Sequence, residues 1–202
     1  MMKKISFTIL LSLVVASSAM SQNLFPLLGG QRVGTASATF LKIDGVYHMW
    51  YTGSSPEPVG SIGHATSSDG ITWTMYSGNP VLVHEPFDDW NEKTVYEPNV
   101  IRDGTLFRMW YTSSNDPQLP GPIHIHHATS EDGIIWSKDT LNNPIVSPGS
   151  SGSWDNQWVD SHCIILFDSI YHMWYAGSNG TNIRIGHATS ADGVTWTKDP
   201  NN

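Results

Sequence analysis

The sequence between residues 46 and 76 reads VYHMWYTGSSPEPVGSIGHATSSDGITWTMY, and its signature occurs three times along the chain. Met-Trp-Tyr recurs at 49–51, 109–111 and 173–175, His-Ala-Thr-Ser begins at 64, 127 and 187, and Asp-Gly-x-x-Trp ends each copy at 69–73, 132–136 and 192–196. Regular self-similarity at a period of about 60 residues is typical of an array of identical supersecondary units. The repeat therefore decides the fold.

Each copy divides into four short strand-prone runs separated by turn residues. In the first copy the runs are 38–43, 46–52, 62–66 and 72–76. Asp44-Gly45 between the first two is a strong hairpin signal, because glycine adopts a positive φ without steric cost. No stretch shows helical periodicity. The sequence predicts an all-β protein, a β-propeller whose blades are four-stranded antiparallel sheets.

The expected blades cover approximately residues 33–83, 87–147 and 153–202, within a single propeller domain at 22–202. Propellers close with about four to eight blades. In the first two copies an Asn-Pro segment and a further apolar pair follow the last tryptophan, whereas the third copy stops at Asn202. We therefore expect the chain to be the amino-terminal part of a longer ring.

The amino terminus has the pattern of a secretory signal peptide. Lys3 and Lys4 precede an apolar run at 5–16, which is too short to cross a bilayer, and small residues follow it. Ala19 and Ser21 fit the small-x-small cleavage rule, so the predicted signal peptide is 1–21. We expect a secreted or periplasmic protein.

The charge balance limits the partners. The formal net charge is −8, and the lysines and arginines form no cluster. Nucleic acid and membrane surfaces are therefore not expected partners, because binders of phosphate backbones concentrate positive charge on one face. The single cysteine, Cys163, cannot form an internal disulfide and is read as a small apolar residue in the run 163–167. The oligomeric state is left open.

The repeat also resembles a known superfamily. Its Trp-Asp or Phe-Asp lead-in, Met-Trp-Tyr, Ile-Gly-His-Ala-Thr-Ser, Asp-Gly-x-x-Trp and Asn-Pro-Val are similar to the five-bladed propeller glycosidases: arabinanases, β-xylosidases, invertases and levansucrases, including glycoside hydrolase family 43. The resemblance extends from about Val33 onward and implies that about three of five blades are present. Sialidases are an alternative, but their turn motif has one more residue between Asp and Gly than Asp69-Gly70.

Positions that differ between the copies are the candidates for a site, because recurring positions belong to the scaffold. His64, His127 and His187 recur and are read as packing or hydrogen-bonding residues, and Asp69, Asp132 and Asp192 as turn formers. The entrance of the first strand differs in each copy. It contains Glu97 in the second copy and Asp160 in the third.

In the resembled glycosidases, carboxylates at this level of different blades converge on an axial pocket. Glycosidic bond cleavage needs a protonated carboxyl on the leaving oxygen and a second carboxylate that activates water or attacks carbon. Glu97 is the candidate acid and Asp160 its partner. The first copy has Ser37-Ala38-Thr39 where the resemblance implies an Asp. Aligned from their valines, Asp160 matches Tyr96, so the two acids lie on opposite strand faces unless a bulge shifts one.

Further candidates surround this strand entrance. His124 and His126 alternate along one strand and share a face, which favours a solvent-facing or pocket-rim role over a two-histidine metal site. His162 and Arg184 are candidate sugar hydrogen-bond donors, and Trp90, Trp154 and Trp158 are candidate stacking platforms. The sequence indicates no cofactor and no metal. Whether a structural ion lies in the axial channel is left open.

Two functional hypotheses follow. The first is a glycoside-hydrolase-like protein that acts on glycosidic bonds of polysaccharides or oligosaccharides, with catalysis depending on the full-length ring. The second is a propeller that binds carbohydrate, or another surface, without catalysis, because the first copy lacks the carboxylate. A sialidase-like propeller is a further alternative. Under each hypothesis the expected partner is carbohydrate.

Overall fold

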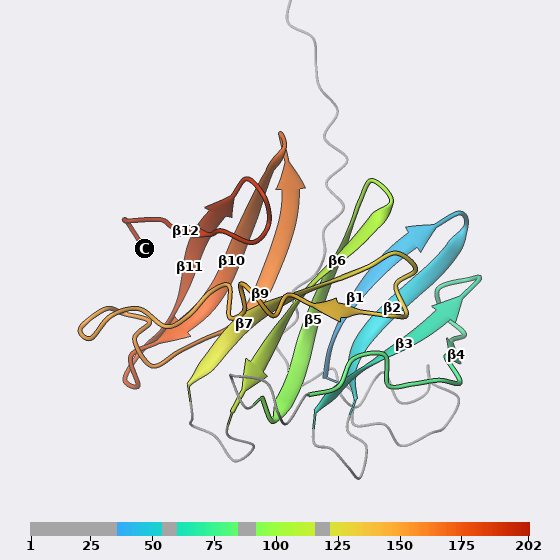
Figure 1. The fold of residues 1–202 in the computed structure, drawn as a ribbon, viewed down its shortest axis with the longest axis horizontal. Helices are drawn as coiled ribbons and strands as arrows, with labels where there is room; N and C mark the ends of the chain where they lie inside the picture. The colour runs from blue at the N-terminus through green and yellow to red at the C-terminus, as the bar shows by residue number, and fades with distance from the viewer. Residues whose placement is uncertain (1–35, 54–59, 85–91, 116–121) are drawn as a thin grey trace, which may run out of the picture.

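The computed structural model describes residues 36–53, 60–84, 92–115 and 122–202. These residues form three separate four-stranded antiparallel sheets, which stand side by side as consecutive blades (Figure 1). No helix occurs in the described ranges. The predicted all-β architecture with four-stranded antiparallel blades is therefore confirmed, and three blades are present.

The strands follow one another in the order in which they pair within each blade. Blade 1 contains β1 (Ala36–Ile43), β2 (Val46–Gly53), β3 (Ser61–Ser67) and β4 (Thr74–Met75). Blade 2 contains β5 (Thr94–Asp103), β6 (Leu106–Ser114), β7 (Ile123–Ser130) and β8 (Ser137–Lys138). Blade 3 contains β9 (Trp158–Phe167), β10 (Ile170–Ser178), β11 (Ile183–Ser190) and β12 (Thr197–Lys198).

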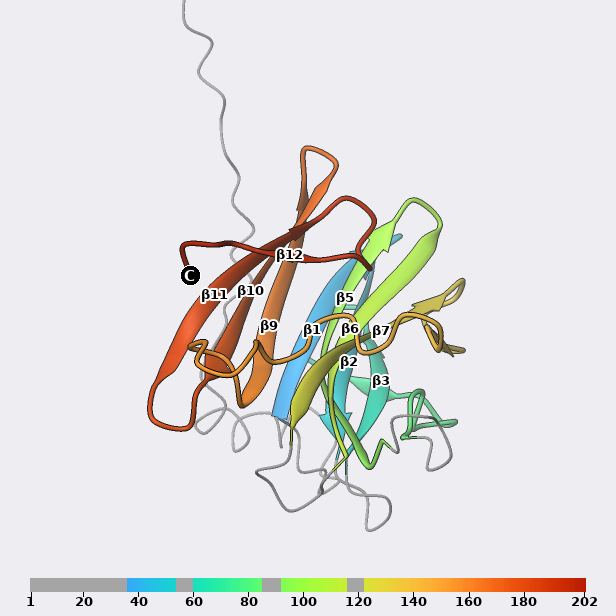
Figure 2. The same ribbon diagram turned by 60° about the vertical axis from the view of Figure 1, so that its left-hand side comes forward.

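The first three strands of each blade are long, and the fourth is short. Figure 2 shows β9, β10 and β11 as long ribbons that run side by side. The fourth strand has two residues, fewer than the predicted run 72–76. An asparagine side chain continues the edge instead: Asn79 accepts from the His64 N–H at 2.8 Å and donates to its carbonyl at 2.9 Å. Asn143 and Asn202 bind His127 and His187 in the same way.

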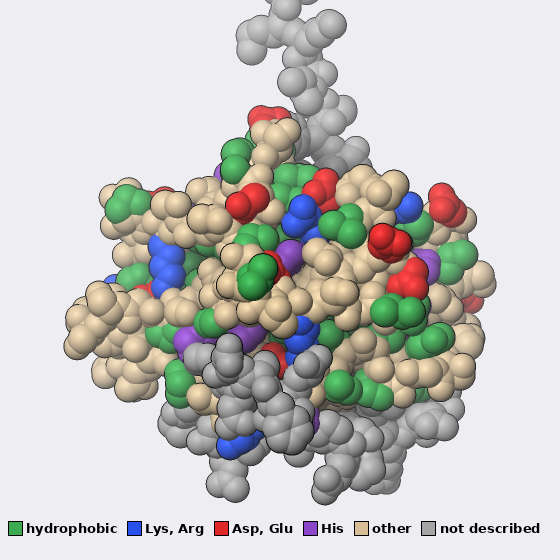
Figure 3. Space-filling model, viewed as in Figure 1, with side chains coloured by type: hydrophobic (Ala, Val, Ile, Leu, Met, Phe, Trp, Pro, Cys, Tyr) green, Lys and Arg blue, Asp and Glu red, His purple; other side chains and the backbone are tan. Residues whose placement is uncertain are grey.

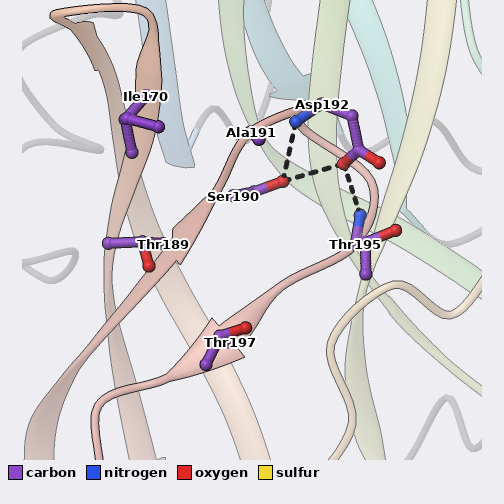
Figure 4. Close-up of a pocket in the computed structure, with 7 residues that line it drawn as sticks. All are labelled: Ile170, Thr189, Ser190, Ala191, Asp192, Thr195 and Thr197. Carbon is purple, nitrogen blue, oxygen red and sulfur yellow. Dashed lines mark hydrogen bonds between the residues drawn. The ribbon is translucent and has the colours of Figure 1, made fainter.

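The Asp-Gly turn between the third and fourth strands is held by the aspartate side chain. In blade 3 the Asp192 carboxylate accepts the N–H group of Thr195 at 2.7 Å, and the Ser190 hydroxyl donates to it at 2.9 Å (Figure 4). It also accepts the N–H group of Val194 at 2.8 Å. These hydrogen bonds favour the ionised form and hold the pKa of Asp192 well below its usual range. The equivalent bonds recur at Asp69 and Asp132, so the predicted turn-forming role is confirmed.

Neighbouring blades are joined by a tryptophan that reaches into the next blade's turn. The Trp50 indole N–H donates to the Gly133 carbonyl at 2.7 Å, and the Trp110 indole donates to the Gly193 carbonyl at 2.8 Å. The turn tryptophan of the accepting blade meets the same indole edge-on, with Trp50 and Trp136 at 6.3 Å between ring centroids. The interface between blades 1 and 2 and the interface between blades 2 and 3 therefore contain the same contact.

Apolar side chains fill the two interfaces around these hydrogen bonds. Between blades 1 and 2, Trp50, Ile62 and Leu82 pack against Val100 and Met109. Between blades 2 and 3, Trp110, Ile125 and Val146 take the same places. The recurring histidines of the third strands lie beneath the tryptophans, at 5.1 to 5.5 Å between ring centroids. Their predicted role as packing residues is confirmed.

The predicted signal peptide 1–21 lies outside the described residues. None of the described segments is a helix long and apolar enough to cross a membrane. Cys163 lies within β9, opposite Trp174 of β10, and is partly buried. On the face shown in Figure 3, the lysine and arginine side chains of the described residues are scattered among neutral ones.

We expect Trp110→Phe to lower the free energy of unfolding by about 2–4 kcal/mol, because it removes the hydrogen bond to Gly193 and leaves a cavity in the interface. Trp174→Phe is the matched control. The Trp174 side chain is 41% exposed, and we expect a loss below about 1 kcal/mol. Urea unfolding measures both values, and equal losses would contradict this account of how the blades are joined.

Candidate active site

The first strand of every blade carries a β-bulge at the same place. In β5, Tyr96 pairs with Thr112 and Asn99 with Trp110, so Glu97 and the following proline together oppose one residue. The pairing shifts at the equivalent place in β1 and in β9. At each bulge one residue other than glycine has a positive φ: Ser37 at 48°, Glu97 at 53° and Ser161 at 47°.

The bulges settle how Glu97 and Asp160 come together. Asp160 pairs with Ala176 of β10, which makes it the register equivalent of Tyr96, as their alignment predicted. The two carboxyl groups nevertheless lie side by side, because both accept the Ser161 N–H, at 2.9 Å from Glu97 and 2.8 Å from Asp160. A bulge turns the bulged side chain away from the alternation of a regular strand, and this bulge directs Glu97 of blade 2 toward Asp160 of blade 3.

Three blades supply the surroundings of the Glu97 carboxyl. One oxygen accepts the Ser161 N–H at 2.9 Å, and the other is 3.4 Å from each of the Ser37 and Ser161 hydroxyls. The same Ser161 N–H lies 2.8 Å from an Asp160 oxygen. The Glu97 N–H donates to the Thr52 hydroxyl at 2.8 Å, which fixes the backbone of the bulge to blade 1. The site therefore forms only when the blades are assembled.

The environment keeps Glu97 protonated near neutral pH. Burial raises its pKa to about 8, with further contributions from the negative charge of Asp160 and the hydrogen bond between the two carboxyls. The hydrogen bonds from Ser161 oppose the shift and do not cancel it. A carboxyl group that is still protonated at neutral pH can act as a general acid.

Tyr96 and His162 flank the pair. Burial, followed by the charges of Asp160 and Glu97, raises the pKa of Tyr96 above its ordinary value. Burial lowers the pKa of His162 to about 4, although the charge of Asp160 acts in the opposite direction. The imidazole is therefore neutral at pH 7 and can offer one donor and one acceptor. His162 was predicted as a sugar ligand, and the structure places it beside the acid pair.

The two other predicted histidines lie inside blade 2. His126 is buried over the Tyr111 ring at 5.5 Å between centroids, and its Nδ1 is 3.9 Å from a Glu92 oxygen. His124 contacts the Ser147 hydroxyl at 3.0 Å. Burial lowers both pKa values, to about 4 for His124 and about 3 for His126. These contacts are those of packing residues, and a role at a pocket rim stays a prediction.

Trp154 lies within blade 3. It stacks on Tyr175 at 5.6 Å between ring centroids and covers Gly177 and Gly186, where a Cβ atom would meet the indole at 2.7 and 2.6 Å. In blade 2, His126 occupies the position of Gly186 and its ring lies over the corresponding tyrosine, Tyr111. One face of the Trp154 indole is therefore covered by Tyr175 of the same blade.

The remaining predicted ligands lie on the strands of blade 3. Trp158 begins β9, two residues before Asp160, and pairs with Ser178, and Arg184 is an exposed residue of β11 that pairs with Gly177. Their role as sugar ligands stays a prediction. Trp90 lies outside the described residues. Among the described residues no group of three histidine, cysteine or acidic side chains could hold a metal ion.

Sequence reasoning missed four residues that shape the site: Ser37, Thr52, Tyr96 and Ser161. The alignment contained a signal for two of them, since Ser37 and Ser161 occupy the place of Glu97 in their own blades. A hollow of about 340 Å³ lies elsewhere, at the outer turn of blade 3 (Figure 4), and is lined mainly by Thr189, Asp192, Thr195 and Thr197. Neither Glu97 nor Asp160 lines this hollow.

The fold and the site define a propeller with a half-buried carboxyl pair between the first strands of adjacent blades. Solved structures share this fold. A family 117 glycoside hydrolase of Zobellia galactanivorans superimposes with a TM-score of 0.68 at 19% identity, over 82% of this chain and 55% of that one. A structure from the family of mannoside phosphorylases, which contains glycoside hydrolases that target β-1,2-mannosidic linkages in Candida mannan, gives 0.61 at 23% identity, over 83% and 50%.

Sequence relatives extend the comparison. An uncharacterised protein of Mycobacterium tuberculosis is 34% identical over 139 residues, which are 67% of this chain and 44% of that protein. An N-acetyl-α-D-galactosamine deacetylase of Flavonifractor plautii is 29% identical over 99 residues (45% and 12%), and a 1,2-β-oligomannan phosphorylase of Thermoanaerobacter is 27% identical over 127 residues (59% and 42%). No family model matches. The chain spans less than half the length of these relatives. Its fold is that of the propeller glycoside hydrolases.

The raised pKa of Glu97 predicts a particular pH dependence of stability. Between pH 6.5 and 8 the folded protein keeps a proton on Glu97 that the unfolded chain has released, so the contribution of Glu97 to stability falls as pH rises, by up to about 1.4 kcal/mol per pH unit. The buried histidines with lowered pKa values act in the opposite direction, because the unfolded chain still binds protons around pH 6.5, and their contribution fades toward pH 8. The contribution of Glu97 is therefore the difference in slope between the wild type and a variant without this carboxyl.

We expect the slope of stability against pH between pH 6.5 and 8 to be more positive in Glu97→Gln than in the wild type, as measured by urea unfolding at several pH values. Glu131→Gln, at an exposed position of the blade 2 turn, serves as the control and should keep the wild-type slope. A Glu97→Gln slope equal to that of the wild type would show that Glu97 is already ionised.

Proposed function

We propose that the protein acts on glycosidic bonds of an oligosaccharide or polysaccharide, with Glu97 as the proton donor to the leaving oxygen. One observation carries the proposal: a carboxyl group that stays protonated at neutral pH lies on the inner strand of a blade, against a second carboxyl from the next blade. Glycosidic bond cleavage requires such an acid. The fold shared with glycoside hydrolases and a phosphorylase family supports the same reading.

In this proposal Asp160 tunes the acid. The two catalytic carboxyls of glycosidases lie about 5–5.5 Å apart in retaining enzymes and about 6.5–9.5 Å apart in inverting enzymes, because the sugar or a water lies between them. Glu97 and Asp160 accept the same Ser161 N–H, at 2.9 and 2.8 Å, which leaves no room for a sugar between these oxygens. The negative charge of Asp160 instead helps to raise the pKa of Glu97. This role replaces base or nucleophile as the proposed function of Asp160.

The group that activates water or attacks carbon must then come from elsewhere. Blade 1 offers Ser37 at the bulge, where blade 2 has Glu97, and a serine hydroxyl cannot serve as the second carboxylate. We propose that further blades complete the wall of the site and supply this group. Residues 1–21 retain the pattern of a signal peptide, so we also propose that the protein is exported.

A specific observation favours a second candidate function. The uncharged Ser37 bulge leaves blade 1 without the carboxylate that the glycosidase resemblance implies. A propeller that binds carbohydrate without cleaving it would keep the scaffold and the buried neutral His162 while losing that acid. Sugar binding without turnover would support this alternative.

The decisive experiment is an assay on a panel of aryl glycosides, including arabinosides, xylosides, fructosides and mannosides. We expect kcat/KM to fall about 10²- to 10⁴-fold in Glu97→Gln, because the variant cannot donate the proton, and to be unchanged in Glu131→Gln. Full activity of Glu97→Gln on every active substrate would overturn the assignment of the acid.

The pH profile separates the roles of the two carboxyls. The wild-type rate should decline on the alkaline side near pH 8, where Glu97 loses its proton. Asp160→Asn removes the neighbouring negative charge, so we expect the alkaline limb of kcat/KM to move to lower pH while activity below that limb persists. A profile that keeps its alkaline limb while losing all activity would assign Asp160 a direct part in the chemistry.

A further inference from the structure

Blade 1 has no acid at its bulge, but its hydroxyl groups bind the strand that carries Glu97 on both sides of the blade 2 bulge. The Thr52 hydroxyl of β2 accepts the Glu97 N–H at 2.8 Å, and the Thr39 hydroxyl of β1 accepts the Val100 N–H at 3.4 Å. The Ser37 hydroxyl lies 3.4 Å from a Glu97 carboxyl oxygen. Blade 1 therefore contacts both the backbone and the side chain of the candidate acid.

The same positions in blade 2 do not bind in this way. Thr112 and Asn99 occupy in blade 2 the register positions of Thr52 and Thr39 in blade 1. The Thr112 hydroxyl oxygen and the Asn99 side-chain carbonyl oxygen are buried, and among the described residues neither has a hydrogen-bond partner. A threonine at this position can therefore be packed between two blades without a hydrogen bond. The bond made by Thr52 is specific to the strand that carries the acid.

The bulge amide of blade 3 has a different partner. The Ser161 N–H, which corresponds to the Glu97 N–H, donates to the Glu97 carboxyl at 2.9 Å and to the Asp160 carboxyl at 2.8 Å. Glu97 thus binds the blades on both sides: its backbone donates to Thr52 of blade 1, and its side chain accepts from blade 3. The position of the carboxyl depends on both contacts.

The Thr52 hydrogen bond acts on a strained part of the backbone. Glu97 has a φ of 53°, in the left-handed region that is unfavourable for a residue with a side chain. Such a conformation persists only where the surrounding contacts hold it. The bulge in this conformation directs the carboxyl toward Asp160, and a regular strand would direct it elsewhere.

We propose that Thr52 is a positioning residue for the acid, because its hydroxyl holds the Glu97 backbone in the bulge and so keeps the carboxyl beside Asp160. Thr52 acts through Glu97 and not on the reacting atoms. The catalytic consequence of this inference rests on the proposed function, whereas the position and protonation of Glu97 can be tested without it. Blade 1, which lacks the carboxylate, then takes part by holding the acid that blade 2 supplies.

The groups that face the Glu97 carboxyl define what a titration would report. Asp160 of β9 and burial raise its pKa to about 8, while Tyr96 of β5 and His162 of β9 are uncharged at pH 7. The contacts from blade 1 are hydroxyl groups, which carry no charge. Replacing Thr52 by valine changes none of these charges. A change in the pKa of Glu97 in this variant would therefore report a displaced carboxyl.

A ¹³C NMR titration of the full chain, labelled at the glutamate side-chain carboxyls, tests the proposal. The Glu97 signal is assigned by its absence from the spectrum of Glu97→Gln. We expect its midpoint near pH 8 in the wild type and at least about one pH unit lower in Thr52→Val, because a carboxyl released from the bulge becomes solvated. Thr52→Ser keeps the hydroxyl and should titrate like the wild type.

Thr112→Val is the matched control, since it makes the same substitution at the same register position of the next blade. The Thr112 hydroxyl has no partner among the described residues, so its removal should leave the Glu97 midpoint unchanged. If Thr52→Val does not fold, Thr52→Ala and Thr112→Ala provide the same comparison.

The outcomes separate this inference from the proposed function. On any glycoside that the wild type cleaves, Thr52→Val should lower kcat at pH 7 at least about tenfold, change KM little, and move the alkaline limb to lower pH. A wild type that cleaves nothing, with midpoints as expected, would contradict the proposed function and support the positioning role. An unchanged midpoint in Thr52→Val, an equal decrease in Thr112→Val, or a decrease in Thr52→Ser as large as in Thr52→Val would overturn that role.

Discussion

The hydrogen bond from a second-strand indole to the glycine carbonyl of the next blade's turn is the constraint on which the architecture depends. A four-stranded sheet with two apolar faces cannot bury both by itself, so every blade needs a neighbour on each side. The Trp50 and Trp110 indoles fix the distance and orientation of that neighbour. Gly133 and Gly193 are required there, because the indoles leave no space for a side chain.

The acid pair is a consequence of this fixed stacking. Glu97 belongs to blade 2 and Asp160 to blade 3, and their contact depends on how far one blade is rotated and displaced against the next. The bulges then turn the side chains at the entrance of each first strand, at the cost of an unfavourable positive φ at Glu97 and Ser161. Backbone strain thus coincides with the most strongly perturbed carboxyl.

Carboxyl groups removed from solvent occur in two different settings in this protein. Asp155 and Glu92 are also buried carboxylates, but each is paired with a lysine, Lys198 and Lys138, that spans the blade. The Lys198 ammonium helps to hold the pKa of Asp155 below its usual range, and both ion pairs brace the scaffold. Among the described residues no cation contacts Glu97, and the carboxyl group of Asp160 lies beside it. Burial without a cation, and not burial alone, makes Glu97 the chemical candidate.

The sequence alone determined the repeat, the four strands of each blade, the turn-forming aspartates and the identity of Glu97 and Asp160 as the unusual acids. These features are local, because turn chemistry and alternation act over a few residues. Only the tertiary structure decided that the two acids touch, that Ser37 and Ser161 bind Glu97, and that Trp154 and His126 pack inside their blades. Those contacts join residues 15 to 64 positions apart, and they depend on bulges and blade packing that no local pattern specifies.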